Sequence, residues 1–63
     1  MGNVAEKLRR LRGKKTSREV SSELGISQSA LRMYENGYRI PRDEIKVKIA
    51  DYYHMTVQEI FYN

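Results

Sequence analysis

The chain has 63 residues, 40% of them hydrophobic, and a net charge of +4, so we expect one small domain over residues 1–63 with no room for a second. The absence of cysteine excludes disulfides and thiolate zinc sites and fits a reducing cytoplasm. No apolar run approaches the roughly 20 residues that a membrane helix needs, so we expect no membrane partner.

The charges are spread unevenly along the chain. Through Arg42 there are ten lysine and arginine residues against four acidic ones, a balance of +6, whereas the segment from Asp43 onward has a balance of −2. This asymmetry favours a basic front that faces a polyanion, although a merely solvated basic surface would have the same composition. Lys14 and Lys15 are interpreted as loop residues that favour solubility.

The pattern of apolar residues predicts a first helix over residues 3–12. Val4, Leu8 and Leu11 recur there at helical spacing, with charged residues between them. Gly13 follows this stretch and ends the helix, because glycine adopts the left-handed backbone of a helix end without strain.

A capping box opens the second predicted helix. In the run Thr16-Ser17-Arg18-Glu19, the threonine hydroxyl can accept from the amide of the glutamate, whose side chain can reach back to the threonine amide. Val20 and Leu24 then point inward, and Gly25 ends the helix.

The third predicted helix spans residues 28–36. Ser27 is a favourable N-cap for it, because its hydroxyl can accept from an amide in the first turn. Leu31 and Tyr34 lie on its inner side, and Gly37 terminates it.

Two further helices follow. Pro41 precedes the fourth, which runs to about residue 53, and its expected inward positions are Ile45, Ile49, Tyr52 and Tyr53. A second capping box, Thr56-Val57-Gln58-Glu59, opens a short fifth helix through Ile60 and Phe61. No segment shows the alternation of a strand, so the sequence predicts an all-α fold, a compact five-helix bundle without a sheet.

The stretch from Thr16 to Gly37 carries the functional signal. The turn Gly25-Ile26-Ser27 has the length that a helix-turn-helix uses, with Ile26 filling the corner. Ser21 lies where the two helices approach most closely, and its small side chain permits the crossing. The outer face of the third helix is left with Gln28, Ser29, Arg32 and Met33, among them donors and acceptors that suit base edges in the major groove. A solvated helix face is the alternative explanation.

In these motifs the chain resembles the Cro/phage-repressor, or Xre-like, helix-turn-helix family. The resemblance lies in LRRLR at residues 8–12, TSREVSSELGIS at residues 16–27 and YENG at residues 34–37. It continues through RIPRDE at residues 39–44, IADYY at residues 49–53 and VQEIF at residues 57–61. It implies a lambda-repressor-like fold whose third helix enters the major groove.

The resemblance also implies which residues meet DNA. The base-contacting set is Gln28, Ser29, Arg32 and Met33, in which Gln28 suits adenine, Arg32 guanine or a phosphate, and Met33 a thymine methyl. The phosphate-contacting set is Ser17, Arg18, Asn36, Tyr38, Arg39 and Arg42. Arg10 and Glu35 match a structural bridge between the first helix and the end of the third, from which Arg10 could also reach a phosphate.

Some residues depart from the family pattern. Ser21 replaces a common alanine, which is tolerated if its hydroxyl bonds back to a carbonyl one turn earlier. Lys46 takes a position often filled by leucine, so either its stem packs while its charge reaches outward, or Ile45 and Val47 fill the space. His54 stands where glycine often ends the fourth helix, and Met33 is a less informative base reader than a polar residue.

The sequence therefore predicts a sequence-specific, double-stranded-DNA-binding transcriptional regulator, such as a repressor or a phage or mobile-element switch, in a bacterial or phage-encoded cytoplasmic, nucleoid-associated setting. Its expected partners are an inverted-repeat operator, a second copy of the chain on DNA, and RNA polymerase where it touches the transcription machinery directly. Four C-terminal aromatic residues are expected to serve in packing or in the dimer: Tyr52, Tyr53, Phe61 and Tyr62.

Two other classes of function compete with this prediction. A protein-interaction module, an antitoxin or antirepressor with only weak DNA binding, would not need Gln28 and Arg32 beside a basic clamp. An enzyme would need a nucleophile and base, but the chain has one histidine, no cysteine and no glycine-rich phosphate loop. We therefore predict no catalysis, no metal and no cofactor.

Overall fold

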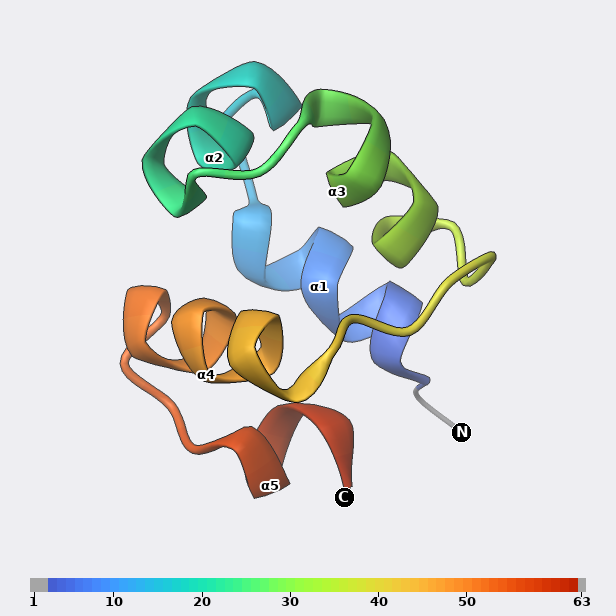
Figure 1. Ribbon diagram of the computed structural model, residues 1–63, viewed down its shortest axis with the longest axis vertical. Helices are drawn as coiled ribbons and strands as arrows, with labels where there is room; N and C mark the ends of the chain where they lie inside the picture. The colour runs from blue at the N-terminus through green and yellow to red at the C-terminus, as the bar shows by residue number, and fades with distance from the viewer. Residues whose placement is uncertain (1–2, 63) are drawn as a thin grey trace.

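Five helices make up the computed structural model, which describes residues 3–62 (Figure 1). They are α1 (Val4–Arg12), α2 (Ser17–Leu24), α3 (Gln28–Glu35), α4 (Asp43–Tyr52) and α5 (Val57–Phe61). The described residues form no strand, and the predicted all-α helical bundle is confirmed. The predicted bounds differ from these by at most one residue at the helix ends. No helix within residues 3–62 is long and apolar enough to span a membrane.

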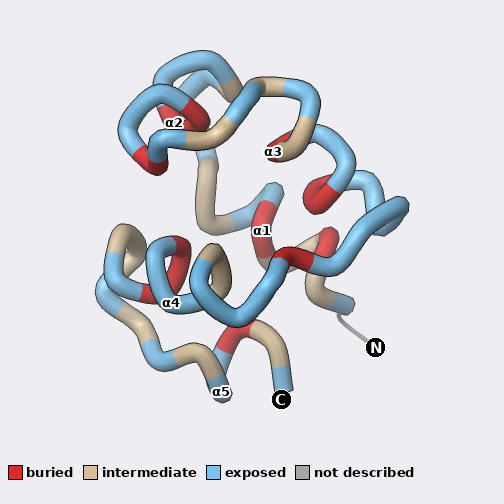
Figure 2. Tube along the Cα trace, viewed as in Figure 1, coloured by how far each residue is buried: buried red, intermediate tan, exposed pale blue. Residues whose placement is uncertain are grey.

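One core holds the five helices together. Its largest fully buried side chains come one from each helix, and none is more than 2% exposed: Leu8, Val20, Leu31, Ile49 and Ile60. Buried segments therefore face the interior on every helix (Figure 2). Helix α1 lies between the α2–α3 pair and the α4–α5 pair and packs on α3 and on α5 (Figure 1). Because none of these short helices is stable alone, the two pairs depend on this shared core.

The helix ends follow the sequence closely. Both capping boxes are formed: the hydroxyls of Thr16 and Thr56 accept from the amides of Glu19 and Glu59, whose carboxylates accept from the threonine amides. At the end of α4, His54 adopts a left-handed backbone with φ of 57°. This is the conformation for which glycine is the usual choice, so a strained non-glycine residue ends α4.

Lys46 resolves one of the alternatives left open by the sequence. Its side chain is only 11% exposed, and its ammonium donates to the Tyr62 hydroxyl at 2.7 Å. The same ammonium lies 4.7 Å from the Tyr62 ring centre and 5.6 Å from that of Phe61. Val47 is 50% exposed, so Lys46 rather than Val47 fills the space beside α5, with its charge placed over two aromatic faces.

The prediction that Arg10 forms the bridge to Glu35 is wrong, because a different arginine of α1 pairs with Glu35. The buried carboxylate of Glu35 pairs with Arg12, whose Nε lies 2.9 Å from Oε2, and Arg9 donates to the Glu35 carbonyl. The helical period explains the difference. Residues 9 and 12 are three apart and share the face of α1 that meets α3, whereas Arg10 points about 100° away from Arg9. Arg10 instead lines a hollow on the α5 side of α1, beside Lys7 and Met55.

Candidate nucleic-acid interface

The turn between α2 and α3 has the predicted construction. Gly25 is left-handed, with φ of 73°, and its amide donates to the carbonyls of Ser21 and Ser22 at the end of α2. The next amide, that of Ile26, donates to the Ser21 carbonyl at 3.0 Å, and the half-buried Ile26 side chain packs on the core. Ser27 then caps α3 by accepting from the Ala30 amide at 3.0 Å. These bonds fix the angle at which α3 leaves α2.

Ser21 is one of the buried residues of α2, the helix that packs on α3. This residue is 4% exposed, and its hydroxyl donates to the Arg18 carbonyl at 3.1 Å. The predicted back-bond to the preceding turn is therefore present. It satisfies the buried hydroxyl and so permits serine in place of alanine.

The outward face of α3 carries the predicted base-contacting residues. Ser29, Arg32 and Met33 are exposed, whereas Leu31 and Tyr34 are buried on the opposite face. Met33 is 41% exposed, which makes it available for an apolar contact as well as for covering the edge of the core. The fold therefore leaves one side of α3 exposed and buries the other.

Gln28, at the first position of α3, is linked to Ser17, at the first position of α2. Its side-chain Nε2 donates to the Ser17 hydroxyl oxygen at 2.8 Å. Gln28 is a predicted base contact and Ser17 a predicted phosphate contact, but the sequence does not predict a bond between them. The contact joins residues 11 apart through the crossing of two helices, and no local pattern signals it.

The start of α2 is the second part of the candidate interface. Thr16 caps the helix through the Glu19 amide, so the earlier amides of Ser17 and Arg18 lie at the open helix end with no intrahelical acceptor. Such amides, together with the helix dipole, form a favourable environment for an anion. Ser17 is half-buried beside Gln28, and Arg18 is exposed.

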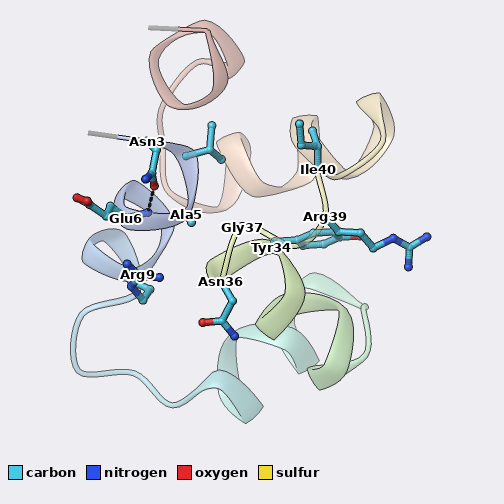
Figure 3. A pocket seen from close by; sticks show the side chains of 10 residues that line it. Asn3, Ala5, Glu6, Arg9, Tyr34, Asn36, Gly37, Arg39 and Ile40 are labelled. Atoms are coloured by element: carbon cyan, nitrogen blue, oxygen red, sulfur yellow. Dashed lines mark hydrogen bonds between the residues drawn. The ribbon is translucent and has the colours of Figure 1, made fainter. Parts of the chain in front are cut away.

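The segment after α3 holds the remaining predicted phosphate contacts. Tyr38 is 80% exposed, Asn36 and Arg39 are also exposed, and Arg42 stands at the N-cap of α4 without a side-chain capping bond. A hollow between this segment and the start of α1 is lined by Asn36, Arg39 and Arg9, and the Arg39 guanidinium extends away from it (Figure 3). Arg9 was not among the predicted site residues.

The arginines of this surface are free of salt bridges. Within the part of the chain that the structure describes, the ion pairs involve Arg12, Lys15 and Lys46, and none involves Arg18, Arg32, Arg39 or Arg42. These four arginines are exposed. Because no neighbouring carboxylate neutralises them, their charges remain available to a polyanion.

Comparison with known families identifies this arrangement. A family model described as helix-turn-helix matches residues 7–60, which is most of the chain. The chain belongs to the Cro/C1-type helix-turn-helix family. It is accordingly a DNA-binding regulator, and double-stranded DNA is its partner. No curated protein and no solved structure gave a significant match.

Proposed function

We propose that this helix-turn-helix regulator recognises an inverted-repeat operator as a homodimer and represses transcription by occupying promoter DNA. Each copy would place α3 in the major groove of one half-site, and the two-fold symmetry of the dimer would match that of the operator. The observation that carries the DNA-reading part of the proposal is the hydrogen bond between Gln28 and Ser17, the first residues of α3 and α2.

That bond leaves the chemistry of base reading intact. Gln28 uses one hydrogen of its amide nitrogen on Ser17, so the second hydrogen and the side-chain oxygen remain for adenine, as donor to N7 and acceptor from N6. The side chain is therefore oriented before DNA arrives, which reduces the rotamer entropy lost on binding. Ser29, Arg32 and Met33 extend the reading surface along α3.

Ser17 would join the base contact to the backbone contact. Its oxygen accepts from Gln28, which leaves its hydroxyl hydrogen free to donate to a phosphate. The amides of Ser17 and Arg18 would face the same phosphate, while Asn36, Tyr38, Arg39 and Arg42 would hold the backbone beyond the other end of α3. The two sets of contacts would then fix the register of α3 in the groove.

The proposed dimer contact lies at the C-terminal end of the domain. Tyr62, the residue that follows α5, is 62% exposed and accepts from Lys46, and Val47, the next residue of α4 after Lys46, is 50% exposed. Exposed apolar side chains flanked by charges of both signs suit an interface that pairs with a copy of itself. Activation through direct contact with RNA polymerase is the other mode of regulation open to a small operator-bound domain.

In-vitro selection from random duplex DNA at moderate salt tests the proposal. We expect enrichment of an inverted repeat with half-sites about one helical turn, roughly 10 base pairs, apart. A single enriched half-site without its repeat would contradict the dimer but not the base reading. If no sequence is enriched, and binding is weak and governed only by salt, a protein partner of the antitoxin or antirepressor kind becomes the better explanation.

A further inference from the structure

Three side chains from three elements meet beside the last turn of α2. Lys15 comes from the loop before α2, Glu23 from the last turn of α2, and Tyr52 from the last turn of α4. The Lys15 ammonium lies 3.0 Å from the Tyr52 hydroxyl and 3.5 Å from Glu23 Oε1, and the Tyr52 hydroxyl donates to the same carboxylate oxygen. We call these three residues the lysine clamp.

The clamp directs Lys15 away from the proposed DNA contacts. In the sequence Lys15 stands only two residues before Ser17, at the anion-binding end of α2. Its ammonium nevertheless reaches Glu23, six residues or about 9 Å farther along the helix than Ser17. The ends of α2 and α4 pack together here, which brings Tyr52 into range (Figure 1). Without the clamp, the flexible stem of Lys15 could turn toward the phosphate at Ser17.

The backbone of Lys15 is held independently of its side chain. Arg12 donates to the Lys15 carbonyl at 2.8 Å while its Nε binds Glu35. Loss of the clamp would therefore free the ammonium without moving the loop. This separation makes the placement of the charge testable by itself.

Stability does not account for the clamp. The side chains of Lys15 and Glu23 are 53% and 52% exposed, and an ion pair so open to solvent contributes little to folding. The hydrogen bonds of the clamp nevertheless favour the charged forms of Lys15 and Glu23. The hydrogen bond to Tyr52 is the main cause that raises the pKa of Lys15 and lowers the pKa of Glu23, so both groups are ionised at neutral pH.

We propose that Tyr52 and Glu23 are positioning residues that hold the Lys15 ammonium off the DNA backbone, and so limit the affinity of the domain for non-specific DNA. The proposal rests on the proposed function, because it assumes that the start of α2 meets a phosphate. A regulator gains discrimination when fewer of its cations bind phosphate indiscriminately, since phosphate contacts strengthen binding to every sequence.

The test is the salt dependence of binding by Tyr52→Phe, which removes the hydroxyl bonds of the clamp. The ring, 5.1 Å from the Lys15 ammonium, and the Lys15–Glu23 pair remain in this variant, so Glu23→Gln combined with Tyr52→Phe is measured beside it. Affinity for a non-specific duplex should rise about 2- to 10-fold at low salt, and the slope of log K against log salt should steepen by about 0.9, the value for one added phosphate contact. Tyr53→Phe makes the same chemical change at the next residue, outside the clamp, and should leave the slope unchanged. Thermal unfolding of each variant checks that it is folded.

A control in a chain that lacks the Lys15 charge tests whether the change in salt dependence comes from Lys15. In a Lys15→Gln chain, adding Tyr52→Phe should change neither the affinity nor the slope. An unchanged slope both in Tyr52→Phe and in Tyr52→Phe combined with Glu23→Gln, or the same increase in the Lys15→Gln chain, would overturn the proposal while wild-type binding still supported the proposed function. Failure of the wild-type domain to bind duplex DNA would overturn both.

Discussion

Two pairs of helices differ in how they hold their polar side chains. The helix-turn-helix pair, α2 and α3, leaves the bonding groups of such a side chain open, whereas the C-terminal pair, α4 and α5, encloses one. Each pair contains one helix that begins with a threonine capping box, α2 in the first and α5 in the second, and each pair packs on α1. In the C-terminal pair, Lys46 is enclosed by Phe61 and Tyr62, and its ammonium is bonded within the chain. In the helix-turn-helix pair, Gln28 is held by one bond and keeps its other bonding groups free.

The difference between Gln28 and Lys46 supports the proposed location of the DNA-binding surface. Both ends contain cross-element polar contacts, so the presence of such a contact does not mark a site. A side chain that is oriented but not saturated can still bind a partner, whereas one that is enclosed can only support the fold. That criterion supports the proposal that α3 and the start of α2 form the recognition surface, and it makes Lys46 a packing residue despite its charge.

The largest expected effect comes from the core that the two pairs share. Leu31→Ala should lower the free energy of unfolding by about 3 kcal/mol, because Leu31 is 2% exposed and the truncation leaves a cavity. Met33→Ala, on the outward face of the same helix, should change it by less than about 0.5 kcal/mol. Urea unfolding of both variants measures the contrast. Equal losses would mean that α3 is not oriented as described.

A change at Gln28 should separate recognition from folding. Gln28→Ala should weaken binding to the selected operator by about 1–3 kcal/mol, mainly by relaxing sequence preference, with little change in stability. Arg42→Ala should weaken binding to all sequences alike and reduce the salt slope by about one. Gln58→Ala, at an exposed glutamine of the C-terminal pair, is the matched control and should do neither. Unchanged affinity and preference in Gln28→Ala would remove this residue from the base-reading set.

The reassigned bridge to Glu35 predicts unequal effects at two neighbouring arginines of α1. Arg12→Met should lower the free energy of unfolding by about 1–2 kcal/mol, because it leaves the buried Glu35 carboxylate without its charged donor. Arg10→Met should have an effect below about 0.5 kcal/mol, since Arg10 is exposed on another face. Thermal unfolding at neutral pH distinguishes the two. A larger loss from Arg10→Met would restore the bridge implied by the family resemblance.

The sequence predicted most of the structure that depends on neighbouring residues, and few of the contacts between residues far apart in the chain. Capping boxes, glycine ends and the inner positions of the helices follow from spacings of three or four residues, and both capping boxes and the back-bond of Ser21 are present. The partner of Glu35, the Ser17–Gln28 bond and the lysine clamp join residues 8 to 37 positions apart. Such contacts depend on helix rotation and crossing, which hydrophobic periodicity does not specify to within one residue.

The smallest expected effect is a gain in stability at the end of α4. Helices α2, α3 and α4 end with the same pair of backbone hydrogen bonds, in which two consecutive amides after the helix donate to carbonyls of its last turn. The first of these two amides belongs to a left-handed residue, which is Gly25 after α2 and Gly37 after α3 but His54 after α4. The closing amides at α4 are those of His54 and the following residue, so the geometry is that of a Schellman end in which a side chain is unfavourable.

Replacing His54 by glycine should therefore raise the free energy of unfolding by about 0.5–1 kcal/mol, since relief of the left-handed strain exceeds the added freedom of glycine in the unfolded chain. In a domain of this size that gain corresponds to a rise in Tm of roughly 2–8 °C. His54→Ala is the control, because alanine keeps the strain while removing the imidazole, and it should give no gain. Equal stabilisation by both variants would attribute the effect to the imidazole rather than to the backbone, and would place the strain elsewhere in the turn.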